Sequence, residues 1–285
     1  MRELVHRLAT AEPIDKVAKP VASKVADVVG HGTVKDVLSG TWLGHPLHPM
    51  LTDLPIGFWT SAFVLDLVGG KRSRAASDRL IGLGILSAVP TAAAGLSDWS
   101  DYLGEERRVG AVHAAANAVA LGLYSWSWMA RRGGRRKAGL TLALLGAGAA
   151  TAGGYLGAHL IYRQGVGTDR NAWKHEGDEW VDVADDLALV EGRPLVVKVG
   201  DDDVLLAKTP AGLVAAISNV CGHAGGPLNE GELDGEGCVT CPWHGSVFRL
   251  ADGHVVHGPA TGHQPRYEVR SEAGRLALRR VRSPI

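Results

Sequence analysis

The chain has 285 residues, of which 46% are hydrophobic, and its 30 basic and 30 acidic side chains give a formal net charge of zero. This length allows two domains of ordinary size, and three cysteines are too few for a disulfide scaffold. Residues 1–162 hold 17 Lys and Arg against 12 Asp and Glu, whereas residues 163–285 hold 13 against 18. A basic, apolar half joined to an acidic half is typical of a membrane anchor that carries a water-soluble head. We expect no nucleic acid among its partners.

Residues 1–40 contain no apolar core of the signal-peptide type. Apolar side chains nevertheless recur in this region at helical spacing: Ile14, Val17, Val21, Val25 and Val28. The stripe predicts an amphipathic segment that lies on the membrane face or on the helices that follow.

Four membrane spans are predicted within residues 41–162: Leu51–Gly69, Leu80–Ser97, Val109–Ala130 and Ala138–Tyr162. The last three contain no Asp, Glu, Lys or Arg and approach or exceed the ~18–20 residues that a crossing needs. The first is weaker because Asp53 and Asp66 bracket it, but a span tolerates an acid near its end or facing the bundle interior. Short links favour an up-down membrane α-helical bundle of four transmembrane helices, and a buried soluble bundle is the alternative.

Positive charge is concentrated in the first and third links between these spans. The first link holds Lys71, Arg72, Arg74 and Arg79, and the third holds Arg131, Arg132, Arg135, Arg136 and Lys137. Since basic loops stay in the cytoplasm, we expect a multi-pass protein of the cell membrane with both termini on the outer side.

Four histidines lie toward one face of the predicted bundle. His45 and His48 precede the first span, His113 lies one turn into the third, and His159 lies one turn before the end of the fourth. Either these histidines have a structural role in turns and at the lipid–water boundary, or they bind a functional group. A pair such as His113 and His159 could bind a b-type haem, another metal or a quinone.

The stretch Gly-Thr-Trp-Leu-Gly-His-Pro-Leu-His-Pro-Met-Leu-Thr-Asp-Leu-Pro-Ile-Gly at 40–57 resembles the signature of a poorly characterised bacterial four-span membrane family. The doubled His-Pro is the specific part. The resemblance implies a membrane location and no particular chemistry.

The amino-acid composition changes after the last predicted span. Residues 163–177 are polar with scattered glycines and predict a tether. In residues 178–285, short runs rich in Val and Leu alternate with Gly, Asp and Pro turns, which predicts a small all-β domain.

Two motifs in this domain carry candidate metal ligands: Cys221-Gly-His223 and Cys241-Pro-Trp-His244. One cysteine and one histidine from each loop are the ligands of a Rieske-type [2Fe–2S] cluster, in which two thiolates hold one iron and two imidazoles hold the other. The same four residues could hold a structural zinc ion.

Residues 178–281 resemble Rieske ferredoxins, in both cysteine loops and in the following Gly258-Pro-Ala, which shields the cluster in that family. Rieske proteins of the cytochrome bc type carry a disulfide between the loops, where this chain has Gly226 and Trp243. They also carry a tyrosine where this chain has Phe248. The resemblance therefore implies the low-potential ferredoxin class.

We predict a membrane-anchored Rieske protein that carries single electrons between a soluble or quinone donor and a redox partner. This is an electron-transfer protein or an oxidoreductase subunit rather than a stand-alone catalyst, and a homo-oligomer is possible. About forty residues follow His244, too few for the mononuclear-iron domain of a Rieske oxygenase. The alternatives are a ferredoxin component serving a separate oxygenase, and a redox sensor controlling a transporter.

Overall fold

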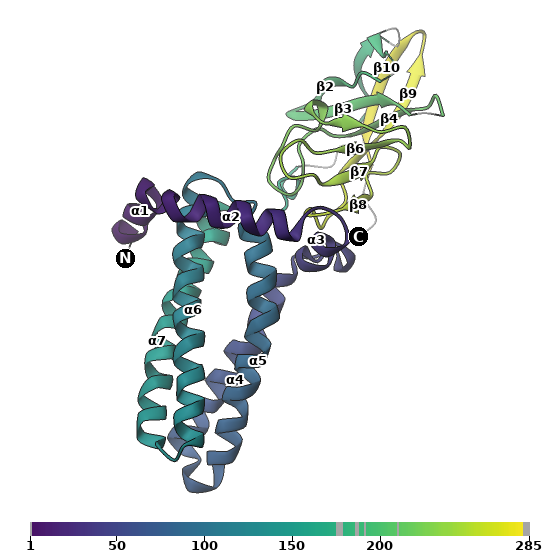
Figure 1. Cartoon of the computed structure of the whole chain (residues 1–285). Coiled ribbons are helices and arrows are strands. Elements are labelled where there is room, and N and C mark those ends of the chain that lie inside the picture. Colours follow the sequence, from purple (N-terminus) through teal and green to yellow (C-terminus); the bar gives the residue numbers. More distant parts are fainter. Residues whose placement is uncertain (1, 175–178, 186–187, 191, 210, 282–285) are drawn as a thin grey trace. The chain divides into compact units, whose positions relative to one another are not determined.

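The computed structural model describes residues 2–174, 179–185, 188–190, 192–209 and 211–281 (Figure 1). The chain divides into two compact units. The helical unit comprises Met1–Gly30 and Leu47–Val166, and the head unit comprises His31–Pro46 and Gly167–Ile285. The segment 31–46 thus belongs to the head, although it precedes the long helices in the chain.

Four long helices run side by side in the helical unit, and a shorter one, α2, lies across one end of them (Figure 1). The elements are α1 (Arg2–Thr10), η1 (Glu12–Ile14), α2 (Asp15–Val29), α4 (Leu47–Val68), η3 (Gly70–Ser73), α5 (Arg74–Trp99), α6 (Gly104–Arg132) and α7 (Arg136–Gln164). The chain forms two hairpins, α4–α5 and α6–α7, with links of a few residues.

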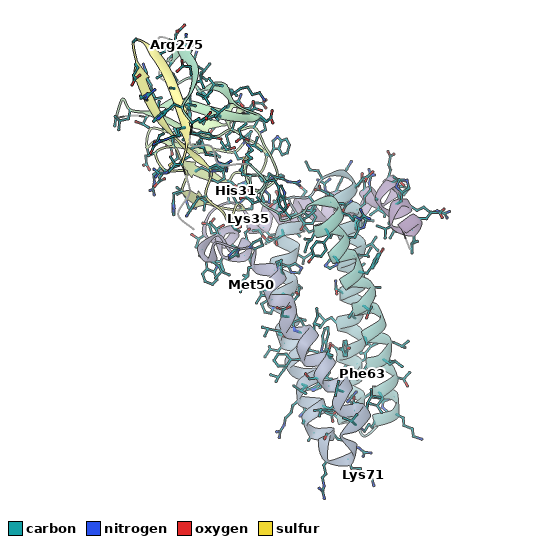
Figure 2. The ribbon with its side chains drawn as sticks, turned by 180° about the vertical axis from the view of Figure 1, so that it is seen from behind. His31, Lys35, Met50, Phe63, Lys71 and Arg275 are labelled. Atoms are coloured by element: carbon teal, nitrogen blue, oxygen red, sulfur yellow. The ribbon has the colours of Figure 1, made fainter. Side chains whose placement is uncertain are left out.

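The outer surface of the long helices is apolar. Met50 and Phe63 of α4, labelled in Figure 2, are exposed, and so are Leu86 of α5 and Leu144 of α7. A large exposed apolar surface is typical of contact with lipid. Three helices are long and apolar enough to cross a membrane, Leu47–Val68, Gly70–Trp99 and Arg136–Gln164. Helix α6 is as long as α7 but is not among these three, so the fourth span stays a prediction.

Helix α2 buries a different face from its valine stripe. Ala18 and Ala22 are buried against Trp99 at the end of α5. Val17 and Val28 of the predicted stripe are exposed. Small residues therefore seat the helix on the bundle, and the valines form a separate apolar face.

The head unit contains two antiparallel sheets. The larger has the strand order β1-β10-β9-β4-β3-β2, and the smaller has the order β5-β6-β7-β8. Its elements are α3 (Thr33–Ser39), η2 (Thr41–Leu43), β1 (Val181–Asp185), β2 (Leu195–Val199), β3 (Asp202–Lys208), β4 (Val214–Ser218), η5 (Leu228–Glu230), β5 (Glu232–Leu233), β6 (Cys238–Thr240), β7 (Val247–Arg249), β8 (Val255–His257), β9 (Arg266–Glu272) and β10 (Arg275–Arg280). The predicted all-β fold of the C-terminal domain is confirmed.

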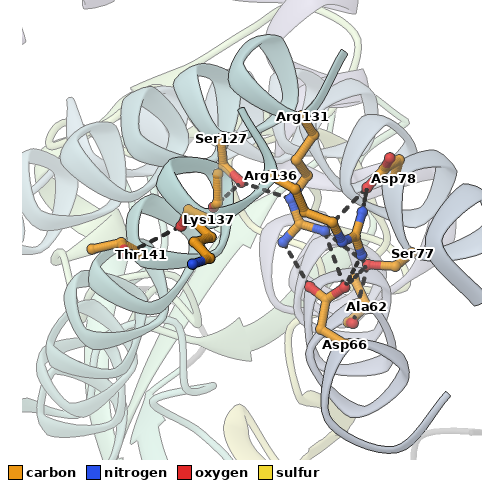
Figure 3. A network of polar contacts seen from close by, with 10 residues as sticks. Ala62, Asp66, Ser77, Asp78, Ser127, Arg131, Arg136, Lys137 and Thr141 are labelled. Atoms are coloured by element: carbon orange, nitrogen blue, oxygen red, sulfur yellow. Dashed lines mark hydrogen bonds and ion pairs between the residues drawn. The ribbon is translucent and has the colours of Figure 1, made fainter. Parts of the chain in front are cut away.

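A buried polar network ties the four long helices together at the end opposite α2 (Figure 3). The guanidinium of Arg131 in α6, whose side chain is 0% exposed, donates to Asp66 of α4 at 2.6 Å and to Asp78 of α5 at 3.1 Å. Arg136 of α7 donates to both carboxylates at 2.7 and 3.1 Å, and the Ser77 hydroxyl donates to Asp66 at 2.8 Å. Two cations face two anions, so the network is neutral as a whole. Pairing of this kind lets charges persist within an apolar bundle.

Replacing Arg131 with Met should therefore destabilise the bundle. The change leaves Asp66 short of a buried partner, and breaking a buried ion pair in this way costs about 3–5 kcal/mol. The thermal midpoint of the detergent-solubilised protein should fall by roughly 10 °C. Arg135→Ala is the matched control, because Arg135 is exposed. Equal midpoints for the two variants would contradict a stabilising role of the network.

Candidate metal centre

Two loops of the same backbone geometry, 221–226 and 241–246, carry the four predicted ligands. In each, the cysteine N–H donates to the carbonyl five residues ahead, and the cysteine carbonyl accepts from the glycine N–H four residues ahead. The four N···O distances lie between 2.8 and 3.1 Å. The glycines, Gly225 and Gly245, have φ of +89° and +74°, a conformation that side chains disfavour. The repeated turn aims both cysteines inward.

The loops bring the predicted ligands together. Cys221 and Cys241 are both buried in a core cluster with Leu228 and Phe248, and their thiols are hydrogen-bonded to each other. The His223 and His244 rings lie perpendicular, with centroids 5.0 Å apart. The two separate motifs thus pair cysteine with cysteine and histidine with histidine.

The electrostatics of the loops suit metal binding. The hydrogen bond from Cys221 lowers the pKa of Cys241 to about 6, which favours a thiolate. Burial, together with the positive charges of His244, Lys35 and Arg170, lowers the pKa of His223 to about 3. A neutral imidazole and a thiolate are the forms that bind a metal.

These residues fit a [2Fe–2S] cluster of the Rieske type. A binuclear cluster separates its ligands into two pairs, one on each iron. The pairing of two hydrogen-bonded thiols and two adjacent imidazoles matches that division.

Trp243 packs on Gly226 at the two positions where Rieske proteins of the cytochrome bc type carry a disulfide. A Cβ atom at Gly226 would lie 3.0 Å from the Trp243 ring and 2.8 Å from Cys241 Sγ. No side chain fits there without a shift, so the Trp243 ring takes over the contact between the two loops. Ser246, in the same loop as Trp243, accepts a hydrogen bond from Ala260 N–H at 3.0 Å and so fastens the shielding segment.

The segment 31–46 is hydrogen-bonded to residues 257–260, which include the shielding segment Gly258-Pro-Ala. The Asp36 carboxylate accepts from Gly258 N–H at 2.6 Å and from His257 Nδ1 at 2.9 Å. The Thr41 hydroxyl donates to Ala260 O at 3.0 Å. His31 lies against Gly245, where a Cβ atom would be 2.8 Å from its Nδ1. Helix α3 and its flanks therefore cover the shielding segment and one edge of the second loop.

Residues 167–174 brace the first loop. Arg170 N–H donates to Gly222 O at 3.0 Å, and Asn171 donates to Val220 O at 2.9 Å and to Gln264 at 2.8 Å. Lys174 reaches Ser218 Oγ at 3.0 Å. Helix α7 ends at Gln164, so much of the predicted tether, 163–177, is helix or bonded to the head. Residues 175–177 lie outside the described residues.

The structure brings together two of the four membrane histidines, and they are not the expected two. His48 and His113 meet with ring centroids 6.3 Å apart and planes at 90°. His48 Nδ1 lies 2.9 Å from Thr91 O, and His113 Nδ1 lies 2.8 Å from Gly153 O. His159 is half-buried on α7, and no contact with His113 joins it to this pair among the described residues.

His45 lies in the head unit, in the stretch between η2 and α4, and its side chain is exposed. It shares the His-Pro motif with His48 but not its surroundings. The sequence places all four histidines near the same end of the predicted spans, whereas in the structure only His48 and His113 are in contact.

Comparison with known proteins finds a family match for each of the two parts of the chain. Residues 179–268 match the family described as Rieske [2Fe-2S] domain, and residues 44–170 match the family described as Predicted membrane protein (DUF2231). The second match and the apolar helices indicate a membrane location. The Rieske domain and the membrane protein domain inferred from the sequence are confirmed, whereas the four spans and the His-Pro signature stay predictions.

The similar proteins include a ferredoxin subunit and an oxygenase subunit. The 3-phenylpropionate/cinnamic acid dioxygenase ferredoxin subunit of Escherichia coli (strain K12) is 31% identical over 88 residues, which cover 31% of this chain and 81% of that protein. The carnitine monooxygenase oxygenase subunit of the same organism is 31% identical over 96 residues, 32% of this chain. The chain spans only 25% of that subunit's length.

Among solved structures, the ferredoxin of carbazole 1,9a-dioxygenase from Nocardioides aromaticivorans IC177 is similar, with 28% identity and a TM-score of 0.34, over 35% of this chain and 96% of that one. Ligand residues, loop geometry and sequence relatives agree. The chain belongs to the Rieske [2Fe-2S] family through its head unit, joined to a predicted membrane protein domain of the DUF2231 family.

Proposed function

We propose that this protein is a membrane-anchored Rieske protein that carries single electrons to or from a redox partner at the membrane. When bound, the cluster takes up and releases one electron. Cys221, His223, Cys241 and His244 would hold the cluster. The buried Phe248 excludes water. The shielding segment Gly258-Pro-Ala closes the site, held by the hydrogen bond from Ala260 to Ser246.

The observation that carries this proposal is the composition of the head unit. Segment 31–46 leads directly into α4, and residues 167–174 follow directly from α7. Both segments are hydrogen-bonded to the cluster loops or to the strands beside them. A freely exchanging ferredoxin has no need of such attachments. Here the cluster support is continuous with the helices that would enter the membrane.

The same observation supports four crossings. A compact unit lies on one side of a membrane, and the head unit contains chain from before α4 and from after α7. The number of crossings between them must then be even. Three apolar helices are too few, so we infer that α6 crosses as well, with its His113 and Arg131 satisfied by neighbouring helices.

A second candidate is a ferredoxin component that serves a separate oxygenase. The ferredoxin subunit named above supports it, and so does one surface residue. Trp243, beside the ligand His244, is 52% exposed. Exposed tryptophans often anchor protein partners. Trp243→Phe, which keeps a ring between the two loops, should weaken electron exchange with a soluble partner more than exchange within the membrane.

The cluster assignment is tested by spectroscopy of the purified full-length protein. We expect two irons per chain and, after reduction, an electron paramagnetic resonance signal with the low average g value of histidine-ligated clusters. His244→Cys should abolish assembly or lower the midpoint potential, because it adds negative charge to the site. Stoichiometric zinc without iron would refute the assignment.

The role of segment 31–46 is tested with a reversible cross-link. A Cβ atom at Gly258 would lie 3.6 Å from Thr41 Cβ, within the range of a disulfide. Thr41→Cys with Gly258→Cys should therefore oxidise to a disulfide, and electron exchange should continue at the unchanged rate. The control pair places the second cysteine at Gly262, which has no Thr41 atom within 4 Å of its Cβ position. Exchange that stops on oxidation and returns on reduction would mean that the segment must leave the head during function.

The crossings are tested by accessibility labelling in a Cys238→Ser background. Cysteines introduced near Gly40 and Gly167 should label from the same side, and one near Gly133 from the opposite side. The basic links favour the outer side for the first two, although Arg131 and Arg136 of the third link are paired with carboxylates. Labelling of Gly133 and Gly167 from one side would rule out an even number of crossings.

A further inference from the structure

The two hairpins of the helical unit share identical residues at fixed offsets, 65 residues between α4 and α6 and 62 residues between α5 and α7. The identical pairs include His48 and His113, Gly57 and Gly122, Arg74 and Arg136, Leu80 and Leu142, Gly84 and Gly146, and Gly95 and Gly157. One offset along each helix pair is what an internal repeat would leave.

Equivalent positions of the two copies meet each other in three layers. The pairs are His48 with His113 at 6.3 Å between ring centroids, Trp59 stacked on Tyr124 at 4.1 Å, and Asp66 bonded to Arg131 at 2.6 Å. Because each layer joins a residue to its own counterpart, a pseudo-two-fold axis runs along the bundle between the members of each pair.

Each histidine is held the same way inside its own hairpin. The carbonyls that they contact, Thr91 O and Gly153 O, are equivalent positions. One turn later, Gly95 and Gly157 make room for the rings. A Cβ atom at these positions would lie 2.6 Å from His48 Cε1 and 3.1 Å from His113 Cε1. Both histidines therefore have the same hydrogen-bond partner position and the same neighbouring glycine position in their own hairpins.

The hydrogen bonds set the protonation of both rings. A carbonyl oxygen only accepts, so Nδ1 carries the hydrogen in each histidine and a neutral ring has its lone pair on Nε2. Asn117 Nδ2 is almost equally far from both nitrogens of His113, at 3.4 and 3.3 Å, which puts it over the ring face rather than in the plane of the lone pair. Histidines that bind metals characteristically donate their other nitrogen to a carbonyl in this way.

This protonation selects the class of ligand. An oxidised quinone offers only carbonyl oxygens and needs a donor, which these neutral rings lack. A bare zinc ion needs about four protein ligands, and no described group of three or more candidate ligands includes this pair. A haem iron already has four porphyrin nitrogens and needs only two from the protein. Two imidazoles on opposite sides of one metal, with bonds of ~2.0 Å, have ring centres about 6 Å apart.

We propose that His48 and His113 are the axial ligands of a b-type haem that lies on the pseudo-two-fold axis between the two hairpins. The proposal deepens the proposed function by giving the cluster a redox partner within the chain. His159 and His45 take no part, since their counterparts in the other copy are Ser97 and Gly110.

The test uses full-length protein purified from membranes of cells supplied with haem. We expect about one haem per chain, with the absorption and low-spin paramagnetic signal of bis-histidine ligation. His48→Ala and His113→Ala should each lower the haem content at least tenfold, whereas His45→Ala and His159→Ala should leave it unchanged. His48→Met should keep the haem and shift its spectrum and potential, which a structural role would not do.

The haem measurements test the haem site independently of the iron–sulfur cluster. A folded protein, shown by its circular dichroism and intact iron–sulfur signal, that takes up no haem would overturn it. So would haem that remains in both alanine variants, or copper or zinc in place of haem. Loss of the iron–sulfur signal with haem retained would instead count against the proposed function and leave the haem site standing.

Discussion

Polar groups within a membrane bundle must be satisfied by the protein, since lipid tails offer neither hydrogen bonds nor charge. In this protein the requirement is met in two layers at opposite ends of the bundle. His48 and Asp66 are 18 residues apart on α4, or about 27 Å at 1.5 Å per residue, close to the ~30 Å of bilayer hydrocarbon. Between these layers lies the aromatic pair of Trp59 and Tyr124. The two polar layers are therefore separated by about the thickness of the bilayer hydrocarbon, with the aromatic pair between them.

Close approach of the helices depends on glycine. Gly84 admits the Trp59 ring and Gly146 admits Tyr124, because a Cβ atom would lie within about 3 Å of either ring. Small residues at helix interfaces are the usual means of packing in lipid. Without them the large interior side chains would hold the hairpins apart, and neither the histidine pair nor the charge network could form.

Much of the head and its ligands was predictable from the sequence. The loops repeat a short local turn whose glycines and cysteines are contiguous, so Cys221, His223, Cys241 and His244 stand out without knowledge of the fold. The bundle was predictable in its helices but not in its pairing. His113 was grouped with His159 by depth alone, whereas rotation about each helix axis directs it to His48. The 65-residue offset between α4 and α6 carries that information, because the two histidines occupy equivalent positions in a repeat. The role of segment 31–46 had no local signal, since Asp36 contacts residues more than 200 positions away.

The attachment of that segment orders the events of biosynthesis. Asp36 and Thr41 leave the ribosome before any membrane helix, but the loop they bind, around Gly258, is made more than 200 residues later. At ~5–20 residues per second, the segment waits roughly 10–40 s for its partner. During this interval the two hairpins are synthesised. In the proposed topology both must be inserted in the correct sense for the segment and the loop to meet on one side of the membrane, so completion of the head would report that the preceding insertion succeeded.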